Sequence, residues 1–64
     1  MQCNYAERLK TLRGERSRRK VAKDLNLSVS AIQMYENAER VPKDAVKIAL
    51  ANYYHSTVQE IFYD

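Results

Sequence analysis

The chain has 64 residues, of which 45% are hydrophobic and 30% charged, and its formal net charge is +3. The length predicts one small domain, residues 1–64. A domain of about 60 residues buries only ~60% of its unfolded surface and is marginally stable alone, so we expect it to form a homodimer. The single cysteine, Cys3, excludes an intramolecular disulfide, and Cys3 and His55 are too far apart in sequence for a zinc site. With no long apolar run and no signal-type N-terminus, we expect a cytoplasmic protein without membrane segment, metal or cofactor.

The first two predicted helices cover residues 4–13, ending near Gly14, and residues 18–25, capped by Ser17. Asn26 follows the second helix, and asparagine tolerates the left-handed backbone that ends helices. The apolar positions that recur at helical spacing are Tyr5, Leu9 and Leu12 in the first helix, and Val21, Ala22 and Leu25 in the second.

Three more helices are predicted in the remaining sequence. Ser28 can cap a third helix over residues 29–37, and Asp44 is the expected cap of a fourth. The segment 57–60, Thr-Val-Gln-Glu, matches a capping box and predicts a short last helix. No stretch alternates over enough residues to predict a sheet. The sequence therefore predicts an all-α, compact bundle of five short helices.

The second and third predicted helices have the spacing of a helix-turn-helix over about residues 18–37. About three residues, from Asn26 to Ser28, join them, and Leu27 is expected to point inward. Ala22 is small where the two helices would cross most closely. An ordinary αα-hairpin also needs a turn and two apolar stripes, so the pattern alone leaves that alternative open.

The charge is unevenly distributed. Of the 11 Lys and Arg residues, eight lie between Arg8 and Lys23, where Glu15 is the sole acid, whereas the following sequence is mildly acidic. This distribution favours a polyanionic partner, with a solvated helix face as the alternative reading.

One face of the third predicted helix is uncharged although it should be exposed. At about 100° per residue, Ile32 and Tyr35 define the buried side. The residues on the opposite side or its flank are Val29, Ser30, Gln33, Met34 and Asn37. Exposed helix faces usually carry Glu and Lys. Short polar groups, an amide and apolar atoms instead suit base edges and thymine methyls in the major groove.

The second helix starts with three cations, Arg18, Arg19 and Lys20. Cations in the first turn oppose the helix dipole, at ~0.3–1 kcal/mol each when exposed. A bound phosphate would reverse this effect, so these residues are candidate phosphate contacts. An ion pair between Lys20 and Asp24 is an alternative explanation for Lys20 alone.

The segment "LSVSAIQMYENAERVP", residues 27–42, resembles the recognition helix and exit loop of Cro/C1-type (XRE) helix-turn-helix regulators. "RLKTLR", "VAKDLNLS" and "ALANYY…TVQEIF" are similar to further segments of that family, in the same order. The resemblance covers nearly all of residues 8–62. It implies a lambda-repressor-like domain of five helices that binds operator DNA, commonly as a dimer.

The resemblance also implies roles for individual residues. Val29, Ser30, Gln33 and Met34 would read bases, Arg18 would contact phosphate, and Asn37 and Arg40 would lie against the DNA backbone. Glu36 would be a buried acid that pairs with an arginine of the first helix, with Arg13 as the candidate. The loop "RGERS" is about two residues shorter than in typical members, which leaves another arginine open as the partner.

Other positions depart from the family pattern. Asn26 and Ala38 replace glycines that are usual in the family, and Ala38 disfavours a left-handed exit from the third helix, so we expect that turn to differ. Glu39 replaces a frequent basic residue and weakens the backbone contact expected there. His55 is interpreted as a turn residue, and Cys3 as a free terminal thiol.

No Gly-rich loop, carboxylate pair or nucleophile with a histidine partner is visible, so we expect no enzyme. The leading hypothesis is a sequence-specific transcriptional regulator, a repressor, that binds a near-palindromic double-stranded operator as a homodimer. The alternative is an antitoxin or antagonist-type module whose C-terminal apolar surface binds another protein. The sequence has more aromatic and apolar groups here than a short tail could leave in water: Tyr53, Tyr54, Ile61, Phe62 and Tyr63. We expect the core to take some of them and a surface of the fourth and last helices, which could also be the dimer interface, to take the rest. A weaker third hypothesis is a non-specific DNA binder.

Overall fold

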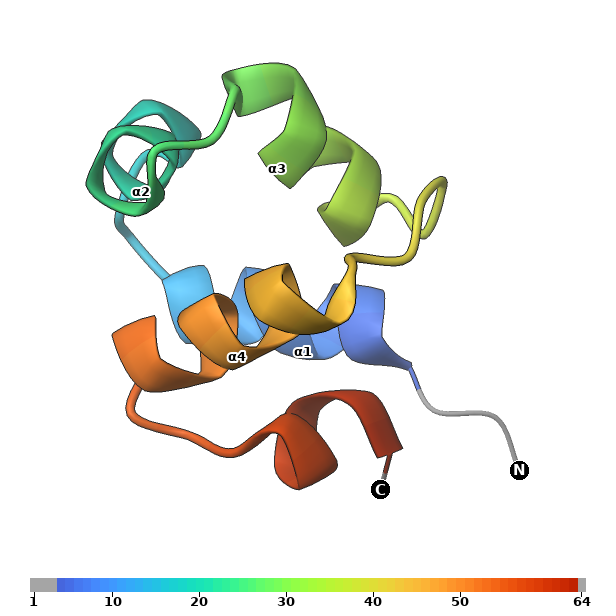
Figure 1. Cartoon of the computed structure of the whole chain (residues 1–64). Helices are drawn as coiled ribbons and strands as arrows, with labels where there is room; N and C mark the ends of the chain where they lie inside the picture. Colours follow the sequence, from blue (N-terminus) through green and yellow to red (C-terminus); the bar gives the residue numbers. More distant parts are fainter. Residues whose placement is uncertain (1–3, 64) are drawn as a thin grey trace.

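The computed structural model describes residues 4–63, and the regular elements of this part of the chain are all helices (Figure 1). The elements are α1 (Tyr5–Arg13), α2 (Arg18–Leu25), α3 (Val29–Glu36), α4 (Asp44–Tyr53) and a π-helical turn, η1 (Gln59–Tyr63). In Figure 1, α2 and α3 lie together at one end of the molecule, α1 and α4 cross its middle, and η1 closes the other end. The expectation of an all-α bundle of five short helices is confirmed.

Local side-chain caps explain where the first three helices begin. The side-chain oxygens of Asn4, Ser17 and Ser28 accept hydrogen bonds from backbone N–H groups three residues later, at 3.2, 3.1 and 3.0 Å. Helix α1 ends at Gly14 and α2 at Asn26, with φ of 56° and 58°. Asparagine is among the few non-glycine residues that adopt this left-handed backbone readily.

The expected cap of α4 needs correction, whereas Thr57 caps the last helix as predicted. Asp44 is not the cap of α4 but its first residue, because Lys43 is the last extended residue (φ −68°, ψ 160°) and its carbonyl closes the first turn. Asp44 therefore favours the helix start through its charge near the dipole. In η1, Thr57 accepts from the backbone N–H of Glu60 at 3.0 Å, as in a capping box. The Glu60 carboxylate, however, accepts from the Ser56 and Thr57 hydroxyls.

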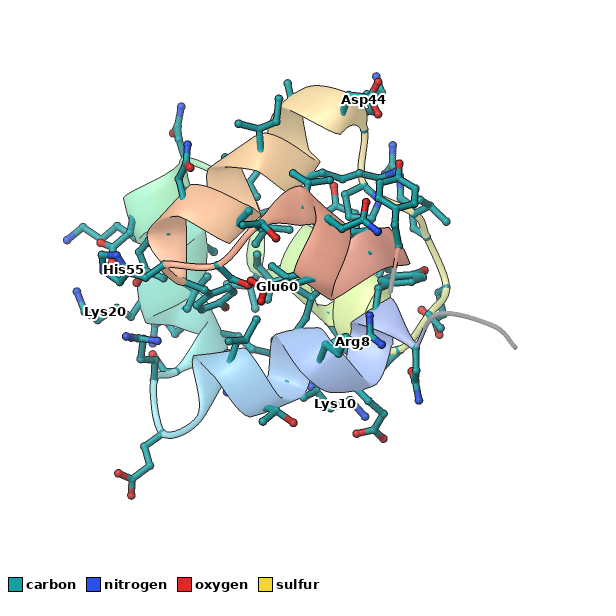
Figure 2. All side chains as sticks on the ribbon, turned by 90° about the horizontal axis from the view of Figure 1, so that it is seen from below. Arg8, Lys10, Lys20, Asp44, His55 and Glu60 are labelled. Carbon is teal, nitrogen blue, oxygen red and sulfur yellow. The ribbon has the colours of Figure 1, made fainter. Side chains whose placement is uncertain are left out.

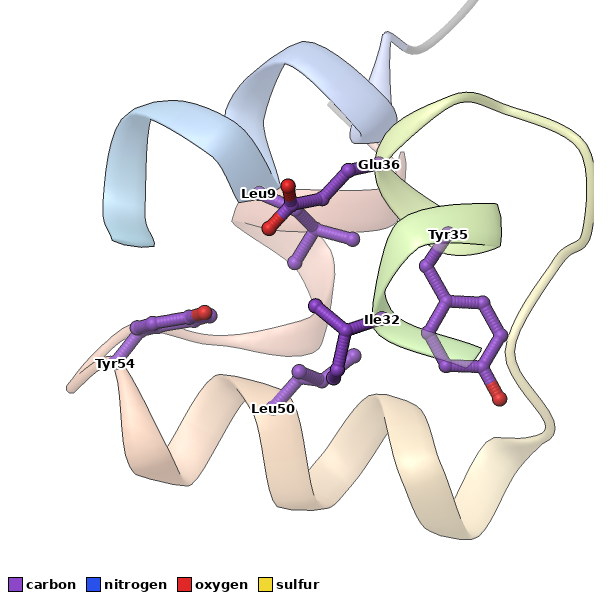
Figure 3. Close-up of a pocket in the computed structure, with 6 residues that line it drawn as sticks. All are labelled: Leu9, Ile32, Tyr35, Glu36, Leu50 and Tyr54. Atoms are coloured by element: carbon purple, nitrogen blue, oxygen red, sulfur yellow. The ribbon is translucent and has the colours of Figure 1, made fainter. Parts of the chain in front are cut away.

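All five elements contribute to the core, and Val21 of α2 is completely buried in it. In Figure 3, Leu9, Ile32 and Leu50 point toward one another from α1, α3 and α4, and Tyr54 closes the far side. These side chains surround a small cavity beside Glu36. Ile32 and Tyr35 are buried, as the helical periodicity predicted. Ala22 is also buried, and its carbonyl accepts from the N–H of Leu27 at 2.8 Å, which closes the turn between α2 and α3.

Candidate nucleic-acid interface

The outer face of α3 carries the residues expected to read bases. Val29 is 40% exposed, Ser30 and Gln33 are exposed, and Met34 is half-buried. Ile32, on the opposite face, is only 2% exposed, which anchors the helix to the core. The element lies at the edge of the molecule, with its neighbour α2 beside it (Figure 1). The structure therefore presents an uncharged helix face on a fixed support.

Cationic and amide side chains are exposed at both ends of the helix-turn-helix. Arg19 and Lys20 are exposed in the first turn of α2. Asn37 and Arg40 are exposed in the segment that follows α3. The Tyr5 hydroxyl donates to the Arg40 carbonyl at 3.2 Å, so the start of α1 holds this segment in place.

Glu36, the last residue of α3, is buried with 2% of its side chain exposed. The structure brings it together with Arg13, the candidate partner from α1. The Arg13 Nε–H and Nη2–H groups donate to Oε2 and Oε1 of Glu36 at 2.7 and 3.1 Å. This hydrogen-bonded contact raises the pKa of Arg13 against the opposing effect of its burial. The shorter loop after α1 therefore does not prevent the pairing.

Arg18 also contacts the Glu36 carboxylate, so a second arginine, which the sequence left open without naming it, shares this partner. Its Nε–H group donates to Oε1 at 3.0 Å, and 34% of the side chain remains exposed. If Arg18 contacts a phosphate, as the sequence led us to expect, it would do so through its Nη groups, because Nε already donates to Glu36.

Lys20 and Asp24 form the ion pair that their spacing allowed, at 3.2 Å. The structure adds Tyr53, whose hydroxyl donates to the same carboxylate at 2.6 Å and ties α4 to α2. The Tyr53 hydrogen bond, followed by the Lys20 contact, lowers the pKa of Asp24. Part of the cationic character of Lys20 is therefore balanced within the protein.

Further side chains hold the scaffold together over long sequence distances. Arg8 of α1 reaches η1 and donates to the carbonyls of Glu60 and Ile61 at 2.9 and 3.3 Å, and Figure 2 shows Arg8 and Glu60 facing each other. The Arg16 guanidinium lies over the rings of Tyr53 and Tyr54, 5.7 and 5.8 Å from their centroids. Sequence reasoning missed both contacts, because neither has a local spacing signal.

The exit from α3 corrects another expectation. Ala38 adopts the left-handed conformation, with φ of 59°, although its side chain disfavours it. Two hydrogen bonds hold the turn: the N–H of Ala38 donates to the Tyr35 carbonyl at 3.3 Å, and that of Glu39 to the Met34 carbonyl at 2.9 Å. The glycine-type turn is therefore kept without the glycine. His55 likewise has φ of 56° in the turn after α4.

Within residues 4–63, no group of three or more His, Cys, Asp or Glu side chains is placed to hold a metal ion. In the same range, no helix has the length and apolar character needed to cross a membrane. Cys3 lies outside the described residues.

Comparison with known families matches residues 4–61 to a helix-turn-helix domain. The matched range runs from the cap of α1 into η1 and contains both α2 and α3. Neither the curated proteins nor the solved structures contain a significant match to the chain. Helix-turn-helix domains place their second helix in the major groove of DNA. With nearly its whole length matched, the chain belongs to the helix-turn-helix domain family, in agreement with its resemblance to XRE-type regulators, and has the fold of a DNA-binding regulator.

Proposed function

We propose that the protein is a sequence-specific, double-stranded-DNA-binding transcriptional regulator that acts as a repressor of the Cro/C1 type. The observation that carries this proposal is the exposed, uncharged outer face of α3, supported from behind by buried Ile32 and Tyr35. A surface used only for solubility would be expected to carry charged side chains there.

The readers are Val29, Ser30, Gln33 and Met34. The Gln33 amide can make two hydrogen bonds to adenine, and Val29 and Met34 can contact thymine methyl groups. Ser30 can donate to a base or a phosphate. The phosphate contacts that fix the register of α3 in the groove are Arg18, Arg19, Lys20, Asn37 and Arg40.

The proposed functional unit is a homodimer of a single domain, residues 1–64, in the cytoplasm. A twofold axis would place two copies of α3 in successive major grooves, ~34 Å apart, on a near-palindromic operator. Bound across a promoter, such a dimer represses by occlusion. Ile48 and Tyr63, which are 54% and 58% exposed beside half-buried Val58, provide an apolar surface that association would cover.

Selection of bound duplexes from a random pool tests this function, with the wild type, Gln33→Ala and the control Asn52→Ala. Asn52 is an exposed amide on α4, outside the helix-turn-helix and the segment that follows it. We expect a near-palindromic motif for the wild type and the control. Gln33→Ala should relax one position in each half-site, where ~1–3 kcal/mol of discrimination is lost. If duplexes are retained at low salt but no motif is enriched, the protein is a non-specific DNA binder.

A second candidate function is favoured by the same exposed surface around Ile48 and Tyr63. In this reading the protein is an antitoxin or antagonist-type module, and DNA binding is secondary. Purification from its native source distinguishes the two: a stoichiometric protein partner that is lost with Ile48→Glu supports the second function. Sedimentation as a monomer at high micromolar concentration would count against the homodimer.

A further inference from the structure

The carboxylate of Glu36 is shared unequally between two arginines. Arg13 gives it two hydrogen bonds and donates a third, from Nη1, to the Arg16 carbonyl at 2.7 Å. Arg13 is therefore engaged through all three of its guanidinium nitrogens. Arg18 contacts Glu36 through Nε alone, and within residues 4–63 this is the hydrogen bond that its guanidinium makes.

This arrangement leaves one positive charge in excess, since one carboxylate faces two guanidinium groups. Arg13 is the more enclosed partner, with 19% of its side chain exposed against 34% for Arg18. The bidentate Arg13 contact balances the charge of Glu36. Arg18 is then the surplus cation, and its side chain is the more exposed of the two.

A contact through Nε also fixes the plane of the guanidinium group. An arginine held in this way presents its two Nη groups as a rigid fork, which matches the geometry of a phosphate. Asn37, the next residue after Glu36, is exposed and was expected to lie against the DNA backbone. The cluster thus joins the start of α2 to the end of α3 at the border of the proposed readout face.

We propose that Glu36 is a positioning residue that orients Arg18 before DNA arrives, so that the Nη groups of Arg18 bind one backbone phosphate. This inference rests on the proposed function, because it assigns a partner to a residue of the same interface. Without the Glu36 contact, the long Arg18 side chain would be mobile in the free protein and would lose conformational freedom on binding DNA. Its contact to the phosphate would then contribute less affinity.

The test compares Arg18→Lys, Arg18→Gln and the control Arg16→Lys on the duplex selected by the wild type, at several salt concentrations. Lysine keeps the charge but has no Nε–H group and no planar fork. We expect Arg18→Gln to lower affinity about tenfold and to reduce the salt slope by ~0.9, as for the loss of one phosphate contact. Arg18→Lys should keep most of the slope yet lose several-fold in affinity, whereas Arg16→Lys should bind as the wild type does.

The proposal is overturned if Arg18→Lys binds like the wild type, or if Arg18→Gln leaves the salt slope unchanged. The Glu36→Gln variant, once shown to be folded, provides a second test. Adding Arg18→Lys to this variant should no longer change its affinity for DNA. A persisting difference would show that Glu36 does not position Arg18.

A measurement without DNA separates this inference from the proposed function. In nitrogen-15 NMR spectra of the free protein, the Nε–H proton of Arg18 should exchange with water more slowly than that of exposed Arg19. Equal exchange rates would contradict the positioning contact, even if the protein binds its operator. Conversely, slow exchange in a protein that enriches no DNA motif would refute the proposed function and leave the contact established.

Discussion

Arg13 and Glu36, 23 residues apart in sequence, join the end of α1 to the end of α3 through two hydrogen bonds of 2.7 and 3.1 Å. Because Glu36 is 2% exposed, its charge depends on these partners for compensation. The contact also fixes how α3, which carries the proposed readout face, sits on the rest of the molecule.

We predict that Arg13→Gln lowers the free energy of unfolding by about 2 kcal/mol, because it removes the bidentate partner of a buried carboxylate while Arg18 still contacts that carboxylate. Urea denaturation followed by circular dichroism measures the loss. The matched control is Lys10→Gln, which removes an exposed cation whose contact to Glu7 is 4.0 Å long. That control should cost less than ~0.5 kcal/mol. Similar losses for the two variants would show that the Arg13–Glu36 contact contributes little.

Elements with a local signal were predictable from the sequence. Ser17 and Ser28 cap their helices through hydrogen bonds that span three residues, so the cap and its helix can be recognised together. The exposed face of α3 followed from the helical period once Ile32 and Tyr35 were placed inside. Ala38 was different: its intrinsic preference predicted another turn, but the hydrogen bonds of the exit turn outweigh that preference.

Contacts between distant elements could not be derived in this way. Arg18 and Glu36 are 18 residues apart, and Tyr53 and Asp24 are 29 apart. From its residue type alone, each of these side chains could have several partners. The packing of α2 against α3 and α4 determines which partner lies within reach. For this reason the sequence indicated the surface proposed to face DNA but missed the contacts that Arg18 and Tyr53 add at its border.

The hydrogen bond from Tyr53 to Asp24 leads to a prediction about pH. Because this bond lowers the folded-state pKa of Asp24, its contribution to stability is present above the ordinary aspartate pKa and is lost as pH falls through the lowered value. Tyr53→Phe should move the pKa of Asp24 upward, toward its ordinary range. Carbon-13 NMR titration of the carboxyl group measures this shift.

Lys20→Gln is the control for that titration. The Lys20 hydrogen bond lowers the pKa of Asp24 less than the tyrosine hydrogen bond does, and the Lys20 charge lowers it further, so the loss of Lys20 should also shift this pKa upward. A larger shift for Lys20→Gln would mean that the ion pair, not the hydroxyl, determines the charge of Asp24.

Tyr54 should make the fold sensitive to alkaline pH. Burial, together with the negative charge of Glu36, raises the pKa of the Tyr54 phenol to about 12. Since the folded-state value lies above the unfolded one, this contribution to stability is complete below about pH 10 and disappears as pH rises toward 12. The largest expected loss is ~2–3 kcal/mol, at 1.36 kcal/mol for each pKa unit.

Urea denaturation at about pH 9 and about pH 11.5 tests this, with Tyr54→Phe as the comparison. Both proteins should lose stability through Lys47 and Tyr53, whose pKa values are also raised in the folded state, but the wild type should lose more. Parallel losses would place the titration of Tyr54 in its ordinary range.

The left-handed residue after α3 provides the last prediction. Ala38 has φ of 59°, a conformation that costs a non-glycine residue ~1–2 kcal/mol, whereas glycine adopts it freely. Ala38→Gly should therefore stabilise the protein by about 0.5–1 kcal/mol, after allowing for the greater freedom of glycine in the unfolded chain. Thermal or urea unfolding measures the gain.

Asn26→Gly is the matched control, because Asn26 has nearly the same φ of 58°. Asparagine tolerates this backbone better than alanine, so its replacement should change stability by less. If Ala38→Gly destabilises the protein instead, the strain at Ala38 is smaller than the entropy that glycine adds to the unfolded chain. Alanine would then be more favourable than glycine at this position. It would restrict the segment that places Asn37 and Arg40 at the proposed DNA backbone contact.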